Sequence, residues 1–451
     1  MSQTKDVFIG RSISGTIAKF AIPTVLSQLV TLIYNLADTF FVGRTNDPSQ
    51  VAALTLSFPI FMGLTMIGNL FGIGANSFIS RSLGQGEKEN AKKASTFAFY
   101  GAIMGVVLII AVLAVFMSPI LTAIGARTEE TFLATKKYLT WTVIYGGIPT
   151  VAALMLGHLI RAIGNTKQAS IGMAFGGILN IGLDYVFVQI MGLGAEGAAI
   201  ATFIANIASF AYLFIIVVRT KNSVIVLNPA KLKFKAKIIK QVILVGIPAA
   251  AIIVLGSSGN MILTRLMSAY GDVSIAAYGI VQKIGTIAIQ ITVGLSQGIM
   301  PLLGYCYGAG DMTRFKAVSK YSFWILGCYA ALCMVGVEIF AESLINFFIS
   351  EPLTVKKGIE FLRIWFLCAP GMCFTNLFGS VFQAMGKWVQ SLMLSIIRQA
   401  GLLFPLLILL NRFVGERGLV CAQPVSDNVT LVVGVVMYAL LMRNRQIGKA
   451  I

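Results

Sequence analysis

Long apolar stretches, separated by short polar connections, run along the whole chain. Each stretch holds about 20 or more residues, enough for a helix to cross a hydrocarbon core about 30 Å thick. We therefore predict an all-α integral membrane protein with twelve transmembrane helices. The predicted spans are 17–42, 50–78, 94–117, 135–160, 168–190, 194–218, 241–268, 273–304, 317–342, 357–385, 391–411 and 418–442.

Composition supports a lipid environment. The 451 residues are 57% hydrophobic and 12% charged, about half the charged share of a soluble domain. A net charge of +18 would suggest nucleic acid in a soluble protein, but here the basic residues lie almost entirely in the connections between spans. We therefore expect membrane lipids and no nucleic acid as partners, and a multi-pass protein of the cytoplasmic (inner) cell membrane.

The distribution of Lys and Arg predicts the orientation. Of the 35 residues, 23 lie on the side of the N-terminus, 10 lie in the alternate connections, and Lys283 and Arg398 lie within spans. Because basic residues are enriched in cytoplasmic connections, both termini are expected in the cytoplasm.

The two halves of the chain repeat. The segment 83–86, Leu-Gly-Gln-Gly, matches 307–310, Tyr-Gly-Ala-Gly, and Ile22-Pro23 matches Ile247-Pro248. The offset drifts only from 225 to 221 residues along six spans. An even number of spans makes this a parallel repeat, so we predict two pseudo-symmetric six-helix lobes with a substrate cavity between them.

The longest hydrophilic connection divides the repeat. We predict an N-lobe at 1–218, a basic cytoplasmic linker at 219–240 and a C-lobe at 241–451. The alternating lysines of the linker are either a contact for anionic lipids or a solvated anchor that fixes topology.

Acidic residues deep in spans carry the candidate chemistry, because an Asp at the bilayer centre costs about 2.5–3.5 kcal/mol. Thr31, Asn35 and Asp38 share one helix face. Asn180 and Asp184 are four residues apart, as are Thr202 and Asn206. Carboxylate, amide and hydroxyl oxygens of this kind can bind a hard cation, or two carboxylates can share a proton. Interhelical hydrogen bonding is the alternative for the Asn and Thr residues.

Other polar residues in the spans allow two interpretations each. Asp427 either bonds to backbone groups freed by Pro424 or contacts substrate. Lys283 and Arg398 either snorkel or face an aqueous cavity. His158 favours capping or packing over a proton relay. The six cysteines favour reduced packing residues over metal or disulfide sites.

Four segments carry a resemblance to a known family. They are 28–43 in the first span, 81–91 and 161–167 in connections, and 423–427 in the last span. The chain resembles the multidrug and toxic compound extrusion (MATE) family over essentially its whole length, in particular the bacterial branch typified by MepA and DinF.

The resemblance implies a secondary active exporter that exchanges cationic or amphiphilic compounds for H+ or Na+ by alternating access, with no other cofactor. It implies a coupling site in the N-lobe at Asp38, Asn180, Asp184 and Thr202, with Na+ as a possible occupant, to which helix periodicity adds Asn35. The substrate-cavity candidates are Tyr34, Gln28, Asn206, Asp427, Lys283 and Arg398. The acidic C-lobe residues of the NorM branch have no counterpart, and the repeat places Leu263 and Leu406 opposite Asp38 and Asp184.

Other function classes fit less well. A lipid-linked precursor flippase or a dedicated metabolite exporter of the same superfamily would share the two lobes. A major-facilitator transporter lacks support in the connection 79–93. No H-E-x-x-H, G-x-S-x-G or G-x4-G-K-[ST] motif occurs, so neither an enzyme nor a primary pump is indicated. We expect a monomer.

Overall fold

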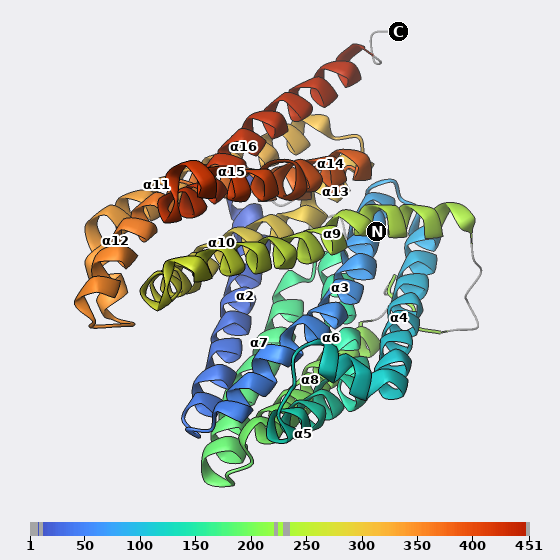
Figure 1. Cartoon of the computed structure of the whole chain (residues 1–451). Coiled ribbons are helices and arrows are strands. Elements are labelled where there is room, and N and C mark those ends of the chain that lie inside the picture. Colours follow the sequence, from blue (N-terminus) through green and yellow to red (C-terminus); the bar gives the residue numbers. More distant parts are fainter. Residues whose placement is uncertain (1–7, 9–11, 221–223, 229–234, 448–451) are drawn as a thin grey trace. The chain divides into compact units, whose positions relative to one another are not determined.

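The computed structural model describes residue 8 and residues 12–220, 224–228 and 235–447, and these residues form helices without strands (Figure 1). The first half contains α2 (Ile13–Gly43), α3 (Pro48–Gly84), α4 (Lys88–Ala123), α5 (Glu129–Leu139), α6 (Gly147–Ala162), α7 (Thr166–Asp184) and α8 (Gly194–Arg219). The second half contains α9 (Ala236–Met267), α10 (Asp272–Gly308), α11 (Met312–Asn346), α12 (Pro352–Phe366), α13 (Ala369–Ala384), α14 (Trp388–Ile396), α15 (Phe404–Val414) and α16 (Glu416–Ile447). π-helical segments occupy Thr140–Tyr145, Tyr185–Ile190 and Ile397–Leu403, and Ser268–Tyr270 is a 3-10 turn.

Ten helices of the described chain are long and apolar enough to cross a membrane, or up to twelve if each of two bent pairs is one span. The pairs are Glu129–Tyr145 with Gly147–Ala162, bent by 49°, and Pro352–Phe366 with Ala369–Ala384, bent by 44°. The prediction of an all-α membrane protein is confirmed. The spans predicted as continuous at 135–160 and 357–385 are instead bent.

Local sequence explains both bends. In the first pair, the π-helical segment Thr140–Tyr145 widens the helix. A Cβ at Gly146 would lie 2.7 Å from the carbonyl oxygen of Trp141, so glycine is required where the chain turns into α6. In the second pair, Pro370 disfavours a helical conformation at the residue before it. Hydropathy is unaffected by either feature, which is why the pattern predicted unbroken spans.

The repeat is visible in the helix boundaries. Corresponding helices of the two halves begin 222 to 224 residues apart, as in α3 and α10 or in α6 and α13. The turns after α3 and α10 also match, because Gly86 and Gly310 adopt φ of 81° and 74°. Only glycine reaches that region without steric cost, so the same backbone turn is encoded twice.

The chain divides into two compact units. The first unit comprises residues 1–250, 297–311 and 384–386, and the second comprises 251–296, 312–383 and 387–451. The lobe boundaries expected from the repeat stay a prediction. Part of the predicted linker, residues 221–223 and 229–234, lies outside the described residues.

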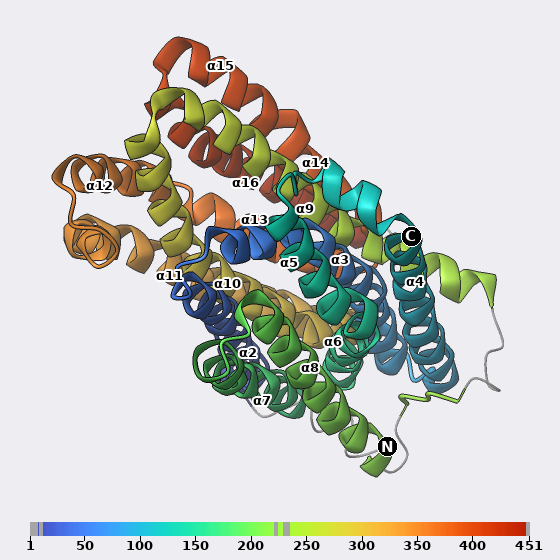
Figure 2. The ribbon, with the colours of Figure 1, turned by 60° about the horizontal axis from the view of Figure 1, so that its bottom comes forward.

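In the first unit, α7 packs between α2 and α8 (Figure 2). Close approach is possible because glycines of α7 face both neighbours. A Cβ at Gly177 would lie 2.8 Å from Val30 Cγ1 of α2, and one at Gly176 would lie 2.8 Å from the Ala205 carbonyl oxygen of α8. Small residues of this kind let helices pack without a hydrophobic driving force in lipid. The three helices that carry the predicted polar stripes are therefore neighbours.

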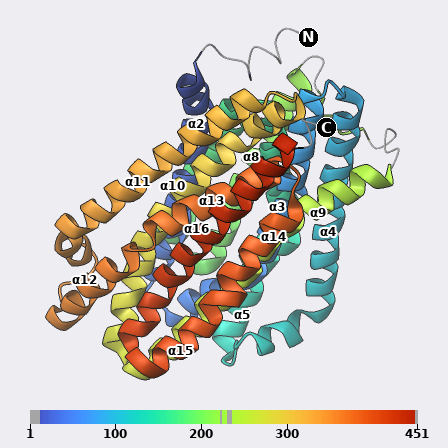
Figure 3. The same ribbon diagram turned by 90° about the horizontal axis from the view of Figure 1, so that it is seen from above.

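In the second unit, α13 and α16 lie side by side (Figure 3). Phe378 and Phe382 of α13 form a cluster with Leu431 and Tyr438 of α16. α16 also packs against α12, α14 and α15. The helix α16 is therefore the element around which the C-terminal part of this unit is arranged.

Candidate functional site

Two carboxyl groups and their polar neighbours meet inside the first unit. Asp38 comes from α2, Asn180 and Asp184 from α7, and Thr202 from α8, and all four side chains are buried. The Asp38 carboxyl group lies beside those of Asp184 and the amide of Asn180. The polar stripes predicted on three separate helices thus converge on one place.

Few donors serve these carboxyl groups. The Asn180 amide donates to Thr202 Oγ1 at 3.4 Å. No donor of the described residues reaches Asp38 Oδ1, Asn180 Oδ1 or either carboxylate oxygen of Asp184. Buried oxygens without a donor are costly, and two adjacent carboxylates cannot both stay ionised without a counter-charge. The arrangement therefore favours a shared proton or a cation.

The available ligands are oxygens of carboxylates, an amide and a hydroxyl. Such oxygens suit a hard cation rather than a transition metal, which prefers imidazole or thiolate. Within the described part of the chain, no three His, Cys, Asp or Glu side chains come together. The site can accept H+ or Na+ by its chemistry.

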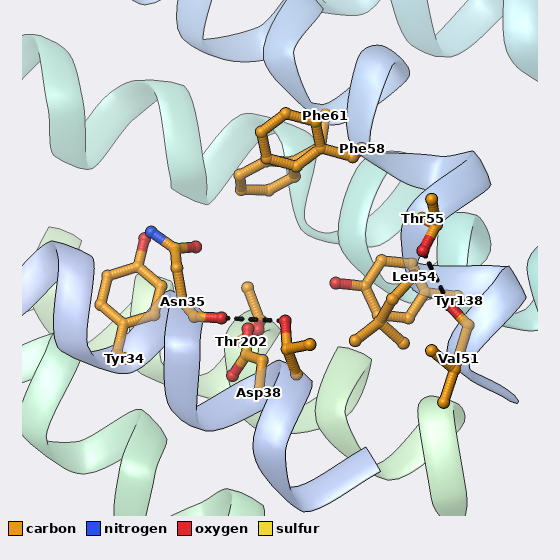
Figure 4. A pocket seen from close by; sticks show the side chains of 11 residues that line it. Tyr34, Asn35, Asp38, Val51, Leu54, Thr55, Phe58, Phe61, Tyr138 and Thr202 are labelled. Atoms are coloured by element: carbon orange, nitrogen blue, oxygen red, sulfur yellow. Dashed lines mark hydrogen bonds between the residues drawn. The ribbon is translucent and has the colours of Figure 1, made fainter. Parts of the chain in front are cut away.

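A cavity of about 280 Å³ opens beside Asp38 (Figure 4). Phe58 and Phe61 lie together on one side of it, across from Asp38 and Thr202. The lining residues are Tyr34, Asn35, Asp38, Thr39, Val51, Leu54, Thr55, Phe58, Phe61, Tyr138 and Thr202. An apolar and aromatic wall with one acidic group is typical of a binding pocket for an amphiphilic cation.

The other predicted residues of the first unit occupy different positions. Asn35 lines the cavity and donates to the Thr31 carbonyl oxygen at 2.7 Å. Tyr34 lines this cavity and a smaller one of about 20 Å³. Asn206 lines the smaller cavity and donates to Thr150 Oγ1 at 2.9 Å. Gln28 lies on α2 and lines neither of these two cavities.

The charged residues of the second unit form a pair. Arg398 donates to Asp427 through Nε at 2.6 Å and through Nη2 at 3.1 Å. Gln423 donates to both carboxylate oxygens at 3.0 Å. Neither interpretation given for Arg398 anticipated this pair, and Asp427 bonds to side chains rather than to the backbone near Pro424. Opposite charges on two neighbouring predicted spans were the signal that could have revealed it.

Lys283 and His158 stand apart from these groups. Lys283 is exposed, with Nζ 6.0 Å from the ring centroid of Phe348. His158 is buried against Gly72, and its Nε2 lies 3.1 Å from Asn69 Oδ1. The surroundings of His158 match the packing role that the sequence favoured.

Comparison with known proteins now decides the family. A family model described as MatE matches residues 23–186 and 248–409, most of the chain and both repeats. The chain belongs to the MatE family. The resemblance found in the sequence is therefore confirmed, and the family and the apolar helices make this a multi-pass membrane protein.

MatE relatives cover nearly the whole chain. "Multidrug export protein MepA" of Staphylococcus aureus strain N315 is 30% identical over 428 residues, 94% of this chain and 92% of that protein. The MepA of Staphylococcus saprophyticus is 29% identical over 436 residues, 96% and 94% of the two chains. A structure titled as the outward-facing conformation of a multidrug resistance MATE family transporter is 21% identical, covers 98% and 99% of the two chains and superposes with a TM-score of 0.92. The latter supports the fold alone.

Several residues of this MatE cavity were missed by sequence reasoning. Phe58, Phe61 and Tyr138 lie in apolar spans where aromatic residues are common. Nothing in their spacing distinguishes a side chain that faces a cavity from one that faces lipid. Their position follows from the rotation of α3 and α5 in the fold.

Proposed function

We propose that this protein is a secondary active exporter of small amphiphilic or cationic compounds, driven by inward movement of H+ or Na+. One observation carries the proposal: Asp38 belongs both to the buried carboxyl pair and to the wall of the aromatic cavity. The MepA relatives, named for multidrug export, support the substrate class. This activity is transport, not enzymatic catalysis.

The position of Asp38 gives a physical basis for exchange. A cationic substrate in the cavity and a coupling ion at Asp38 and Asp184 would compete for the same carboxylate. Two unit charges 4 Å apart interact by about 4 kcal/mol at an effective dielectric constant of 20. A swing of a two-state equilibrium from 1:99 to 99:1 needs about 5.5 kcal/mol, so competition for one carboxylate supplies most of the required coupling.

Roles follow for the remaining residues. Asn180 and Thr202 provide neutral oxygens beside the pair, and Asn35 adds a polar group at the cavity wall. Tyr34 and Phe58 provide flat apolar contact area for a substrate ring. With both termini in the cytoplasm, as the basic residues predict, alternating access would move a compound outward as the ion moves inward. We propose that it acts as a monomer.

The size of the cavity favours this function over lipid flipping. Pockets for drug-sized ligands have volumes of about 300–1,000 Å³, and the cavity of about 280 Å³ lies near the lower limit. A lipid-linked precursor needs a much larger space for its head group. A lipid-flipping assay run beside solute export distinguishes the two functions.

The decisive experiment uses purified protein in proteoliposomes. Export of the lipophilic cation tetraphenylphosphonium is measured with a pH gradient alone, a Na+ gradient alone and neither. We expect transport with one of the two gradients and none without. Equal transport under all three conditions would contradict coupled export.

A further inference from the structure

A column of polar side chains continues from the carboxyl pair along the inside of the first unit. It runs between α2, α7 and α8, towards the end of α7 that the Lys and Arg distribution places in the cytoplasm. The members recur every three or four residues within α2 and α8, so each set lies on one helix face. They are Thr31 and Ser27 on α2, Ser170 and Gln168 on α7, and Asn206, Ser209 and Tyr212 on α8.

Hydrogen bonds connect these helices along the column. The hydroxyl oxygens of Ser27 and Ser170 are 3.5 Å apart. Ser209 donates to the carbonyl oxygen of Gly172 at 3.1 Å. Tyr212 donates to Gln168 Oε1 at 2.6 Å, and both of these side chains are partly exposed. The column therefore ends in contact with solvent.

The upper part of the column contains the small cavity of about 20 Å³. Thr31, Asn180, Thr202, Asn206 and Ser209 all contribute to its wall. A volume of about 10–15 Å³ and two to four polar partners are sufficient for one buried water. Asn180 Oδ1, which has no donor among the described residues, would be one partner.

Glycine creates this space. A Cβ at Gly176 would collide with Ser209 Oγ. Any larger residue at this position would therefore fill the place where a water fits. A polar cavity maintained by glycine beside an unpaired amide oxygen differs from the apolar contacts that pack most membrane helices.

We propose that the small cavity is a water site and that this water, with the hydroxyl groups of the column, conducts protons between the carboxyl pair and the cytoplasmic side. The inference rests on the proposed function and adds a route for its ion. One proton leaves the carboxyl pair as another leaves the Tyr212 end for bulk water. Only O–H bonds break and form, and the column keeps no net charge.

The dimensions select the ion. A space for one water cannot hold Na+ together with the several oxygen ligands that replace its hydration shell, whereas a proton needs only a chain of hydrogen bonds. The titratable groups that face the column and the pair are Asp38, Asp184, Tyr34, Tyr138 and Tyr212. The column therefore favours H+ as the coupling ion.

The first test is structural and needs no substrate. In an experimental density map that resolves ordered water, we expect a water in contact with Ser209 Oγ and Asn180 Oδ1. In Gly176→Ala, this water is expected to be displaced. A dry cavity in the unmodified protein would overturn the proposal.

The second test measures proton flux. The double variant Thr31→Val/Ser209→Ala removes two hydroxyls with little change in volume. In proteoliposomes that contain a pH-sensitive dye, we expect its tetraphenylphosphonium-driven proton flux to fall at least about tenfold, with binding of tetraphenylphosphonium unchanged. Thr142→Val is the matched control, because Thr142 is also buried and its hydroxyl bonds to a backbone carbonyl four residues earlier.

The outcomes separate the two proposals. Unmodified flux in the double variant would overturn the proton column and leave coupled export intact. Gradient-driven export by Asp38→Asn would instead contradict the proposed function. Loss of flux in the Thr142→Val control as well would show that the effect is structural, and it would also count against the column.

Discussion

At the residue scale, the charge of Asp38 is the feature most directly open to test. Asp38→Asn keeps the shape of the side chain but removes the charge that a proton or cation requires. We expect gradient-driven export to be lost, by at least about a hundredfold, with the yield of detergent-solubilised protein unchanged. Transport and yield are measured on the same preparations.

Asp47→Asn provides the matched control for Asp38→Asn. Asp47 caps α3 by accepting from the Ser49 backbone N–H at 2.8 Å, and Asn is an equally good capping residue. This variant should transport normally. If Asp38→Asn exported as well as Asp47→Asn, the role of Asp38 would be wrong.

At the element scale, the pair of Arg398 and Asp427 joins the π-helical segment Ile397–Leu403 to α16. The side chains are 15% and 1% exposed, and loss of one member of a buried pair costs about 3–5 kcal/mol because the other charge is left unpaired. We expect Asp427→Leu to lower the thermal unfolding temperature in detergent substantially.

A double substitution distinguishes lost pairing from lost packing. Arg398→Met/Asp427→Leu removes both charges, and replacement of a whole buried pair by apolar residues is often neutral. The unfolding temperature should therefore recover most of its original value. A double variant as unstable as Asp427→Leu alone would indicate another role for these residues.

A second element-scale feature is the segment 224–228, which follows α8 and lies on α4. Thr96 donates to the Val226 carbonyl oxygen at 2.6 Å and Tyr100 to that of Leu227 at 2.7 Å. Ser95 Oγ accepts from the Val226 N–H at 3.1 Å. These contacts fix the start of the predicted linker to one helix.

Removal of these contacts should release the segment. In Thr96→Val/Tyr100→Phe, we expect trypsin to cleave within 219–240 several-fold faster, because protection follows local stability. Thr122→Val, also on α4, is the control, since Thr122 bonds only to the Ser118 carbonyl oxygen. Equal cleavage in both variants would show that these hydroxyls do not hold the segment.

At the scale of the whole molecule, the two repeats differ in chemistry. Leu263 and Leu406 occupy the positions equivalent to Asp38 and Asp184, so the driving ion should act through the first repeat alone. One charge moving down about 100 mV releases about 2.3 kcal/mol, enough for a roughly fiftyfold substrate gradient. A single ion site can therefore drive useful export.

Distance measurements test this asymmetry. Spin labels on the two repeats should report an ion-dependent change in the unmodified protein and none in Asp38→Asn/Asp184→Asn. Asp272→Asn, at the exposed start of α10, should retain the change. A normal response in the double Asn variant would place coupling in the second repeat.

The sequence determined the membrane class, the repeat and the polar faces of α2, α7 and α8. These features depend on properties that add along the chain: the transfer of each side chain from water to lipid and the 3.6-residue period of a helix. A carboxylate within an apolar run is recognisable without coordinates because its burial is costly.

The tertiary structure decided which of these groups meet. The adjacency of Asp38 and Asp184, the pairing of Arg398 with Asp427, and the aromatic wall of Phe58 and Phe61 depend on how each helix is rotated and bent. In lipid, packing of small residues and interhelical hydrogen bonds set that rotation, rather than hydrophobicity. Such contacts join residues far apart in the chain, so no pattern along the sequence encodes them individually.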